Sequence, residues 1–461
     1  MTLTAFETTP TTLPRTAPAA SAAGQPDRDA PRGRWPLLPL VAAVLLPAVP
    51  ADAVAAWTGY ALPLADLASG VAVLVCVGVL LIGRRRPLTP AAALVLALPV
   101  VGLAVATVTA TDPVAALPGF ARYLQIFVLV PAAVLLLVRD AADFRVVTGA
   151  LVLSALVQGV TGVHQYATGT GASYMGEDIR AVGTFGPEDV MGMATVVGYG
   201  LLAAGAYAFR PAAGRPGWWV PCALGVTAAL VVPLTLSFSR GAWIATAAGG
   251  AVMIAATGAR QALRTLAVLA ACAVVLVGGF GVGSQMLSQR LTSITQVTSA
   301  PDRSVTDRYS MWAAAAGMWR ERPVTGVGLK AFPAHRDGHA SIGLSAGSDT
   351  AGAGQEFVRQ PLLSPHNMYL LVLGEQGLVG FVALVGGWAA LLVGGVYRLA
   401  RARSRRAAAV DCGLAAVGLT VWQCVDFLYA DIGGPSTVLT GVVLGLAAWW
   451  ALAAPEKAAA A

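Results

Sequence analysis

Apolar residues recur along this chain in runs of about 17 to 25 positions, the length that a helix needs to cross roughly 30 Å of hydrocarbon. Short polar segments separate the runs, and one long polar stretch extends from about Ser284 to Ser364. The pattern predicts about twelve transmembrane helices, near residues 36–54, 64–83, 90–109, 119–138, 145–165, 188–208, 218–237, 240–257, 263–284, 368–397, 408–429 and 436–454. We therefore expect an all-α polytopic membrane protein with one large loop between helices 9 and 10.

The composition agrees with this fold class. Hydrophobic residues make up 57% of the chain and charged residues only 11%, whereas roughly a quarter of the residues in a soluble domain are charged. An ordinary soluble globule is thereby excluded. The net charge of +7 is spread over short turns instead of one face, so nucleic acid is not an expected partner.

Basic residues fall in every second loop, and this alternation predicts the topology. Lys and Arg near the ends of spans stay on the cytoplasmic side. The basic positions are Arg32, Arg34, Arg84, Arg85, Arg86, Arg139, Arg145, Arg210, Arg215, Arg260, Arg264, Arg398, Arg401, Arg403, Arg405 and Arg406. Both termini are therefore expected in the cytoplasm and the loops near 166–187, 237–241 and 285–365 outside, which places the protein in the cell inner (cytoplasmic) membrane.

This topology divides the chain into five parts. Residues 1–34, rich in Pro, Thr and Ala, are predicted to form a disordered cytoplasmic tail. Transmembrane helices 1–9 occupy 35–284, the large extracytoplasmic loop occupies 285–365, helices 10–12 occupy 366–454, and a second cytoplasmic tail occupies 455–461.

Three basic or titratable residues interrupt the predicted outer membrane edge, namely Arg180, Arg240 and His366. A guanidinium presents a planar fork that binds phosphate oxygens through two hydrogen bonds, so two arginines can hold a diphosphate. A neutral imidazole can accept a proton from a sugar hydroxyl at neutral pH. Each residue also has a structural interpretation. Arg180 is then a solvated loop residue, Arg240 is a side chain that reaches toward lipid phosphates, and His366 either caps its helix or bonds to a loop carbonyl.

Other polar residues leave alternatives open. The acids Glu177, Asp178, Glu188 and Asp189 either form a cation site or, for the last two, face the positive end of a helix dipole. Within the apolar runs, Glu375 and Asp426 are functional candidates by default, but a hydrogen bond at a helix kink and an interfacial position explain them equally well. In the large loop, 307–319 is predicted to form an amphipathic helix that a tight glycine turn ends, and 333–360 is predicted to be a mobile lid.

Four segments in this order resemble the O-antigen ligase and polymerase superfamily, over roughly residues 90 to 430. They are Arg180-x-x-Gly183-x-Phe185, Ser239-Arg240-Gly241-Ala242-Trp243, Arg308 to Pro323-x-x-Gly326-x-Gly328, and Pro365-His366-Asn367-Met368-Tyr369-Leu370 followed by Glu375-x-Gly377-x-x-Gly380. The chain departs from the family at Gly186-Pro187-Glu188-Asp189, where members often have Asn-Pro-Asn. The donor pocket is therefore expected to differ from theirs in its detailed shape.

The resemblance implies a GT-C-like helical fold, no cofactor and no obligatory metal. It also implies that Arg180 and Arg240 engage an undecaprenyl diphosphate and that His366 is the catalytic base, with Arg308, Asn367 and Glu375 as supporting residues. The implied donor is an undecaprenyl-diphosphate-linked glycan, the acceptor a glycan or lipid-glycan, and membrane lipids are the remaining partners.

The predicted function is therefore a glycosyltransferase of surface polysaccharide biosynthesis that acts outside the cytoplasmic membrane. It would transfer the lipid-linked oligosaccharide to an acceptor hydroxyl with inversion, and it would be a ligase or a polymerase according to the acceptor. The alternative is a membrane transporter of a small anion such as bicarbonate, for which paired broken helices and a polar path across the membrane would be expected.

Overall fold

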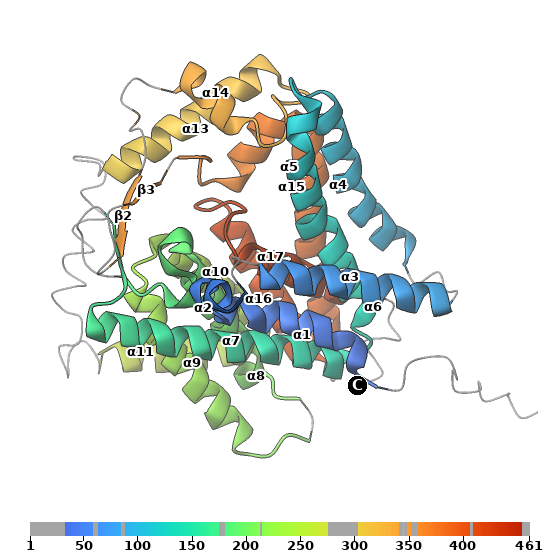
Figure 1. Ribbon diagram of the computed structural model, residues 1–461. Coiled ribbons are helices and arrows are strands. Elements are labelled where there is room, and N and C mark those ends of the chain that lie inside the picture. The colour runs from blue at the N-terminus through green and yellow to red at the C-terminus, as the bar shows by residue number, and fades with distance from the viewer. Residues whose placement is uncertain are drawn as a thin grey trace, which may run out of the picture. The chain divides into compact units, whose positions relative to one another are not determined.

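The computed structural model describes residues 33–58, 63–83, 88–174, 180–212, 214–274, 303–340, 344, 348–352, 358–360, 362–405 and 409–453 (Figure 1). By internal contacts the chain divides into Met1–Gly33 and Arg34–Ala461, and the second unit holds all of the described helices and strands.

A helix lies in each of the apolar segments that the sequence marks. After the first segment these are α3 (Leu64–Gly83), α4 (Pro90–Val108), α5 (Pro113–Leu124) with its continuations η3 (Gln125–Leu129) and α6 (Val130–Leu137), α7 (Ala141–Thr168), α8 (Gly192–Phe209), α9 (Trp219–Leu236), α10 (Arg240–Thr257), α11 (Ala259–Val274), α15 (Met368–Ser404), α16 (Val410–Asp426) and α17 (Thr437–Leu452). Seven helices among the described residues are long and apolar enough to cross a membrane, and two apolar helices are shorter. The helical, multi-pass class is confirmed, while the count of twelve spans and the GT-C class stay predictions.

The first apolar segment differs from the continuous helix that its hydropathy predicts. It is divided into η1 (Trp35–Leu37), α1 (Leu38–Leu45), η2 (Leu46–Ala48) and α2 (Ala51–Thr58). Pro47 and Pro50 lie at or beside the breaks, and a proline inside a helix removes a hydrogen bond and clashes with the preceding turn. Hydropathy predicted the apolar run correctly but missed its breaks.

Close glycine contacts bring the central helices together. A Cβ atom added at Gly102 in α4 would lie 3.1 Å from the Cα atom of Gly380 in α15, and one added at Gly249 in α10 would lie 2.8 Å from the carbonyl oxygen of Gly418 in α16. Small residues at such crossings let helix backbones approach closely in lipid. By contrast, α9 leaves most of its apolar surface exposed, as expected of a helix that faces lipid.

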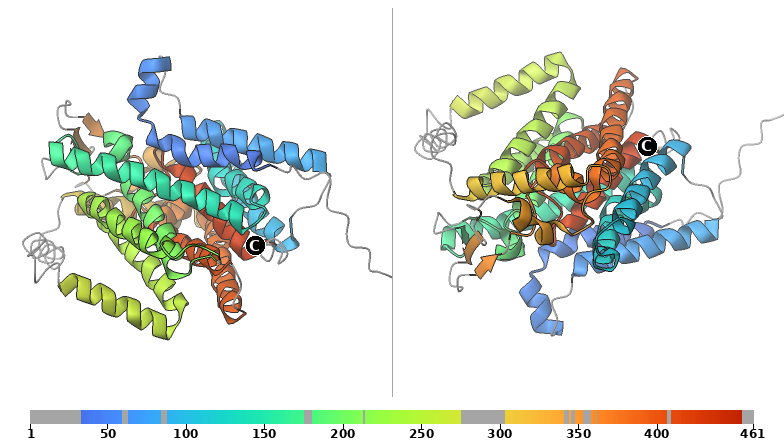
Figure 2. Two further views of the ribbon diagram at one scale, coloured as in Figure 1. Left: turned by 90° about the horizontal axis from the view of Figure 1, so that it is seen from below. Right: turned by 90° about the horizontal axis from the view of Figure 1, so that it is seen from above.

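The large loop contains regular structure at one end of the bundle, which we call the site end. Here α13 (Arg303–Glu321) packs against α15 and α14 (Phe332–His339) (Figures 1 and 2). The amphipathic helix predicted over 307–319 is thereby confirmed. Part of the predicted lid is instead α14, and 341–343, 345–347 and 353–357 lie outside the described residues.

The all-α prediction missed a small sheet. An antiparallel sheet joins β1 (Ala172–Tyr174), β2 (Ser348–Gly352) and β3 (Val358–Gln360), with Ala172 opposite Gly352 and Ser348 opposite Gln360. It connects the loop after α7 to the large loop. Strands of three to five residues are too short to show a periodic pattern in the sequence.

A break in α15 provides the docking site for the glycine turn of the large loop. Gly377 has a φ of 61°, outside the helical region. Around it the backbone bonds to the turn: Val327 N donates to Gly374 O (3.0 Å), Gly328 N to Glu375 O (2.9 Å) and Leu378 N to Pro323 O (2.9 Å). Irregular backbone at membrane depth is tolerated where protein satisfies it. Two of the four segments that carry the family resemblance thus bind each other directly.

Candidate functional site

The segment that carries Arg180 is held against α7 and the end of α9. Arg180 exchanges backbone hydrogen bonds with Ala172 at 2.7 and 3.0 Å, and Ala181 N donates to Leu236 O (3.1 Å). Gln165 Oε1 accepts from the backbone amides of Val182 and Gly183 at 3.1 and 2.8 Å. Arg180 therefore lies on a fixed segment beside the turn that leads to Arg240, and not on a freely solvated loop.

Arg240 is the first residue of α10. Ser239 caps this helix, its hydroxyl accepting from Ala242 N at 3.2 Å. A positive charge at a helix N-terminus opposes the helix dipole, typically by about 0.3–1 kcal/mol. Helix stability therefore does not explain an arginine here. Phe238, two residues earlier, has a φ of 49°, and such strained conformations cluster at functional sites.

His366 also has a left-handed backbone, with a φ of 49°. The next residue, Asn367, caps α15: its Oδ1 accepts from Leu370 N (3.0 Å) and its Nδ2 donates to Leu428 O (3.1 Å). On the other side, Trp312 Nε1 donates to Pro365 O (2.9 Å). The histidine is thus held between α13 and the loop after α16. The helix cap is Asn367, so the alternative interpretation of His366 as the cap is wrong.

The surroundings of His366 favour its neutral form. Burial lowers the pKa of the imidazole below its usual value, the nearby Asp431 carboxylate opposes this shift, and the Arg308 guanidinium adds to it. A lowered pKa leaves the imidazole unprotonated at neutral pH, as a general base requires. Arg308 therefore lies within electrostatic range of the candidate base.

A loop that the sequence did not mark as functional joins these segments. It covers residues 427–436, between α16 and α17. Met368 N donates to Phe427 O (2.8 Å), and a Cβ atom added at Gly241 would lie 3.0 Å from Cβ of Tyr429. The loop thus contacts both the Arg240 turn and the His366 segment. The available signals were Asp431 and the Gly433-Gly434-Pro435 turn.

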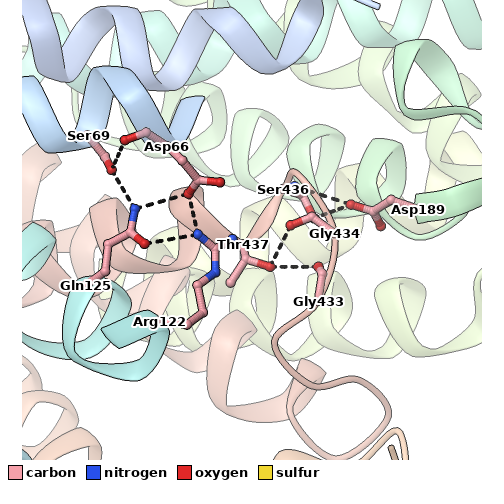
Figure 3. Close-up of polar contacts among 9 residues, drawn as sticks. All are labelled: Asp66, Ser69, Arg122, Gln125, Asp189, Gly433, Gly434, Ser436 and Thr437. Atoms are coloured by element: carbon pink, nitrogen blue, oxygen red, sulfur yellow. Dashed lines mark hydrogen bonds and ion pairs between the residues drawn. The ribbon is translucent and has the colours of Figure 1, made fainter. Parts of the chain in front are cut away.

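The acidic residue Asp189 is bonded to this same loop. Its Oδ2 accepts from the Ser436 hydroxyl (2.7 Å) and the Ser436 amide (3.3 Å), beside the start of α17 (Figure 3). Burial raises the pKa of this carboxyl, while the hydrogen bonds from Ser436 counteract the rise. Glu177 and Asp178 lie outside the described residues. Within the described part of the chain, no group of three or more His, Cys, Asp or Glu side chains is placed to hold a metal ion.

A second polar network, also missed, surrounds Arg122. Its Nη1 donates to Asp66 Oδ1 and to Gln125 Oε1, and Gln125 Nε2 donates to Asp66 Oδ1 (3.1 Å) and Ser69 Oγ (2.9 Å) (Figure 3). Gln125 begins the π-helical turn η3, and such turns are frequent at functional sites. The signal for this network was an arginine inside an apolar run.

Glu375 is placed differently from the other candidates. Its side chain is buried in α15, and Oε1 accepts from Phe332 N (3.0 Å) at the start of α14. It supports the connection between α14 and α15, in agreement with the structural interpretation. Asp426 is buried at the end of α16, so it too belongs to the site end.

Residues 225–385 match a family model described as O-antigen ligase. The matched region runs from α9 into α15 and includes Arg240, Arg308 and His366, while Arg180 precedes it. No curated protein matches the chain. The family match agrees with the resemblance carried by the sequence segments and supports an O-antigen ligase-like family, and the apolar helices support a multi-pass membrane protein.

Proposed function

We propose that this protein is a glycosyltransferase that moves an undecaprenyl-diphosphate-linked oligosaccharide to an acceptor hydroxyl on the outer face of the cytoplasmic membrane. Both termini then lie in the cytoplasm and the site end lies outside. The observation that carries the proposal is that the segments of Arg180, Arg240 and His366, which are far apart in sequence, are linked: Ala181 N bonds to Leu236 O, Met368 N bonds to Phe427 O, and Gly241 packs against Tyr429 of the loop 427–436. The family match supplies the reaction class.

The donor diphosphate is assigned to Arg180 and Arg240. Their segments share the hydrogen bond between Ala181 N and Leu236 O, so the two arginines are carried by backbone of fixed relative position. Each guanidinium group can donate two parallel hydrogen bonds to phosphate oxygens and remains charged at any physiological pH. They stabilise the negative charge that develops on the leaving diphosphate, and the proposal requires no metal for this task.

His366 is assigned the role of general base. Its imidazole takes the proton of the acceptor hydroxyl while the acceptor oxygen forms a bond to the anomeric carbon. The bond between that carbon and the diphosphate oxygen breaks, and its electron pair leaves with the diphosphate. Direct displacement inverts the anomeric configuration. In this scheme Arg308 keeps the base unprotonated, and Asn367 orients its backbone.

Transport of a small anion, the alternative function, gains no support. The family match names a ligase, and the candidate polar residues gather at the site end instead of along a path through the bundle.

The decisive experiment is transfer by purified protein in lipid nanodiscs, supplied with undecaprenyl-diphosphate oligosaccharides and extracted surface glycans of the host. Wild type is compared with His366→Ala, and His339→Ala is the matched control, because His339 bonds to Glu321 away from the proposed chemistry. Longer lipid-linked glycan identifies a polymerase, and glycan moved to another acceptor identifies a ligase. A folded His366→Ala variant that is fully active removes His366 from the base role, and no transfer by folded wild type contradicts the proposed function.

A further inference from the structure

Buried polar atoms without a hydrogen-bond partner concentrate in one place. Among the described residues there are seven such side-chain atoms, and five of them are Tyr123 Oη, Glu375 Oε2, Gln376 Nε2, Gln376 Oε1 and Asp431 Oδ2. The other two belong to Ser154 and Trp319. We call Tyr123, Glu375, Gln376 and Asp431 the Tyr123 cluster. Native folds satisfy nearly all buried polar atoms, so a concentration of exceptions needs an explanation.

These four side chains come from three elements but face one another. Tyr123 lies in α5, Glu375 and Gln376 lie beside the break in α15, and Asp431 lies in the loop after α16. The Tyr123 hydroxyl is within electrostatic range of Glu375 and Asp431 and within interaction range of the Gln376 side chain, but the Tyr123–Gln376 pair does not reach hydrogen-bonding geometry. Asp431 in turn acts electrostatically on His366. The cluster therefore adjoins the candidate base.

A structural role does not account for the cluster. Tyr123 and Gln376 are 0% exposed and Glu375 is 1% exposed, so water does not compensate their polar atoms. Phe at 123 and Leu at 376 would have similar volumes without the desolvation cost. Glu375 accepts from the backbone amide of Phe332 through Oε1 and also interacts with the backbone of Lys330, while Oε2 has no hydrogen-bond partner.

The chemistry of the cluster selects one class of ligand. Two carboxylate oxygens accept hydrogen bonds, while the amide and the phenol both donate and accept. A ligand with several hydroxyl groups matches this set, whereas a phosphate would be repelled by the carboxylates. Aromatic rings border the cluster: the ring centroids of Tyr123 and Phe127 are 5.7 Å apart, and those of Phe127 and Phe427 are 6.4 Å apart. Ligand sites commonly combine such apolar walls with a few polar groups.

We propose that the Tyr123 cluster binds the hydroxyl groups of the acceptor sugar and holds that sugar for His366, an inference that rests on the proposed function. The five atoms are enclosed, so the sugar enters when the cover over them moves. The turn 323–328 lies beside two residues of the cluster, because it is held to the backbone of α15 by hydrogen bonds that include Gly328 N to Glu375 O (2.9 Å). The hydroxyl groups of the bound sugar then form hydrogen bonds with the atoms that have no partner in the closed site.

The test uses Tyr123→Phe and Gln376→Leu, which remove unpartnered atoms with little change of volume. Each is expected to raise the KM for the acceptor glycan about tenfold, the effect of one lost hydrogen bond, and to leave the KM for the donor within about twofold. Each should also raise the thermal unfolding temperature, because it removes an uncompensated buried group. Ser154→Ala is the matched control: it also removes an unpartnered buried atom, so it should stabilise the protein without changing the acceptor KM.

An unchanged acceptor KM in Gln376→Leu overturns the inference, and so does a lower unfolding temperature in both variants, because the atoms would then have partners within the fold. A readout without turnover separates this inference from the proposed function. Oligosaccharides released from the host surface glycan should raise the unfolding temperature of wild type and of Ser154→Ala, but not of Gln376→Leu. If that protection is present while wild type transfers nothing, the proposed function fails and the sugar site stands.

Discussion

Buried charged side chains have different partners at the two ends of the helix bundle. At the end opposite the site, Arg145 binds Asp411 through two hydrogen bonds of 2.7 and 2.9 Å. The fully buried Asp143 forms ion pairs with both Arg34 and Arg139. At the site end, Glu375 and Asp431 each keep an enclosed oxygen without a partner. The ion pairs at the first end stabilise the fold, whereas the carboxylate oxygens at the second end can still accept hydrogen bonds that the fold does not supply.

Backbone conformation shows the same difference. The three non-glycine residues with positive φ among the described residues are Phe238, Lys330 and His366, and all three belong to the site end. Strained residues persist only where the surrounding structure fixes them. Functional sites commonly depart from the local rules that the rest of a fold obeys. Variants at the two ends should therefore separate stability from activity.

The largest effect is expected from Arg145→Ala at the stable end. It leaves Asp411 buried and unpaired, and breaking a buried pair in this way costs about 3–5 kcal/mol. Denaturant or thermal unfolding in detergent should show the loss, while the transfer rate per folded molecule is retained. The double variant Arg145→Met with Asp411→Leu should regain most of the stability, since no unpaired charge remains. Wild-type stability in the single variant would show that this pair does not stabilise the fold.

Arg240→Lys, at the site end, should show the opposite behaviour. The charge is retained but the planar fork is lost, so transfer should fall about ten- to a hundredfold, the range for one charge-assisted hydrogen bond, with little change in unfolding temperature. Arg320→Lys, at an exposed position in the last turn of α13, is the control and should be active. Wild-type turnover in Arg240→Lys would instead favour a side chain that reaches toward lipid headgroups.

The pH dependence of transfer should identify the base. Burial and Arg308 lower the pKa of His366 and Asp431 opposes them, so activity should persist below the ordinary imidazole pKa and fall only at lower pH. Arg308→Gln removes a positive charge and should move the acid limb to higher pH. Asp431→Asn should move it to lower pH. The stability of the fold should depend on pH in the same direction as activity. The stabilisation that comes from the lowered pKa of His366 is present above the pKa of the unfolded chain and is lost as the pH falls through the lower pKa of the folded protein. A limb that neither variant moves would point to another titrating group.

The sequence predicted the helices well because each apolar run is a local property, as α3 and α9 illustrate. It missed the breaks at Pro47 and Pro50 because hydropathy averages over them. It offered a helix kink as one explanation of Glu375, but no local signal shows that the break at Gly377 receives the turn at Gly326. That contact joins residues about fifty positions apart.

The sequence marked candidate site residues where residue chemistry was unusual for its place, and it gave no signal for residues whose neighbours are decided by packing. Arg240 and His366 stood out because basic and titratable residues are scarce at the predicted outer membrane edge, whereas basic residues gather at the cytoplasmic edge. Their roles stay predictions. Asn367 caps α15, and its expected supporting role stays a prediction. Tyr123 was missed because a tyrosine in an apolar run gives no sign of its neighbours, and Asp431 because a loop aspartate is ordinary.

The smallest effect is expected from relieving backbone strain within the site end. His366→Gly should raise the free energy of unfolding by about 1 kcal/mol, since glycine adopts a positive φ without steric cost, and it should abolish transfer. Lys330, with a φ of 60°, offers the matched variant Lys330→Gly, which should gain similar stability and keep its activity. Thermal unfolding and transfer assays of the two variants side by side check this. A contrary result is a His366→Gly protein with a lower unfolding temperature than wild type, beside a stabilised Lys330→Gly protein. It would mean that the imidazole itself stabilises the fold. The contrast between the two ends would then not hold at the residue proposed as the base.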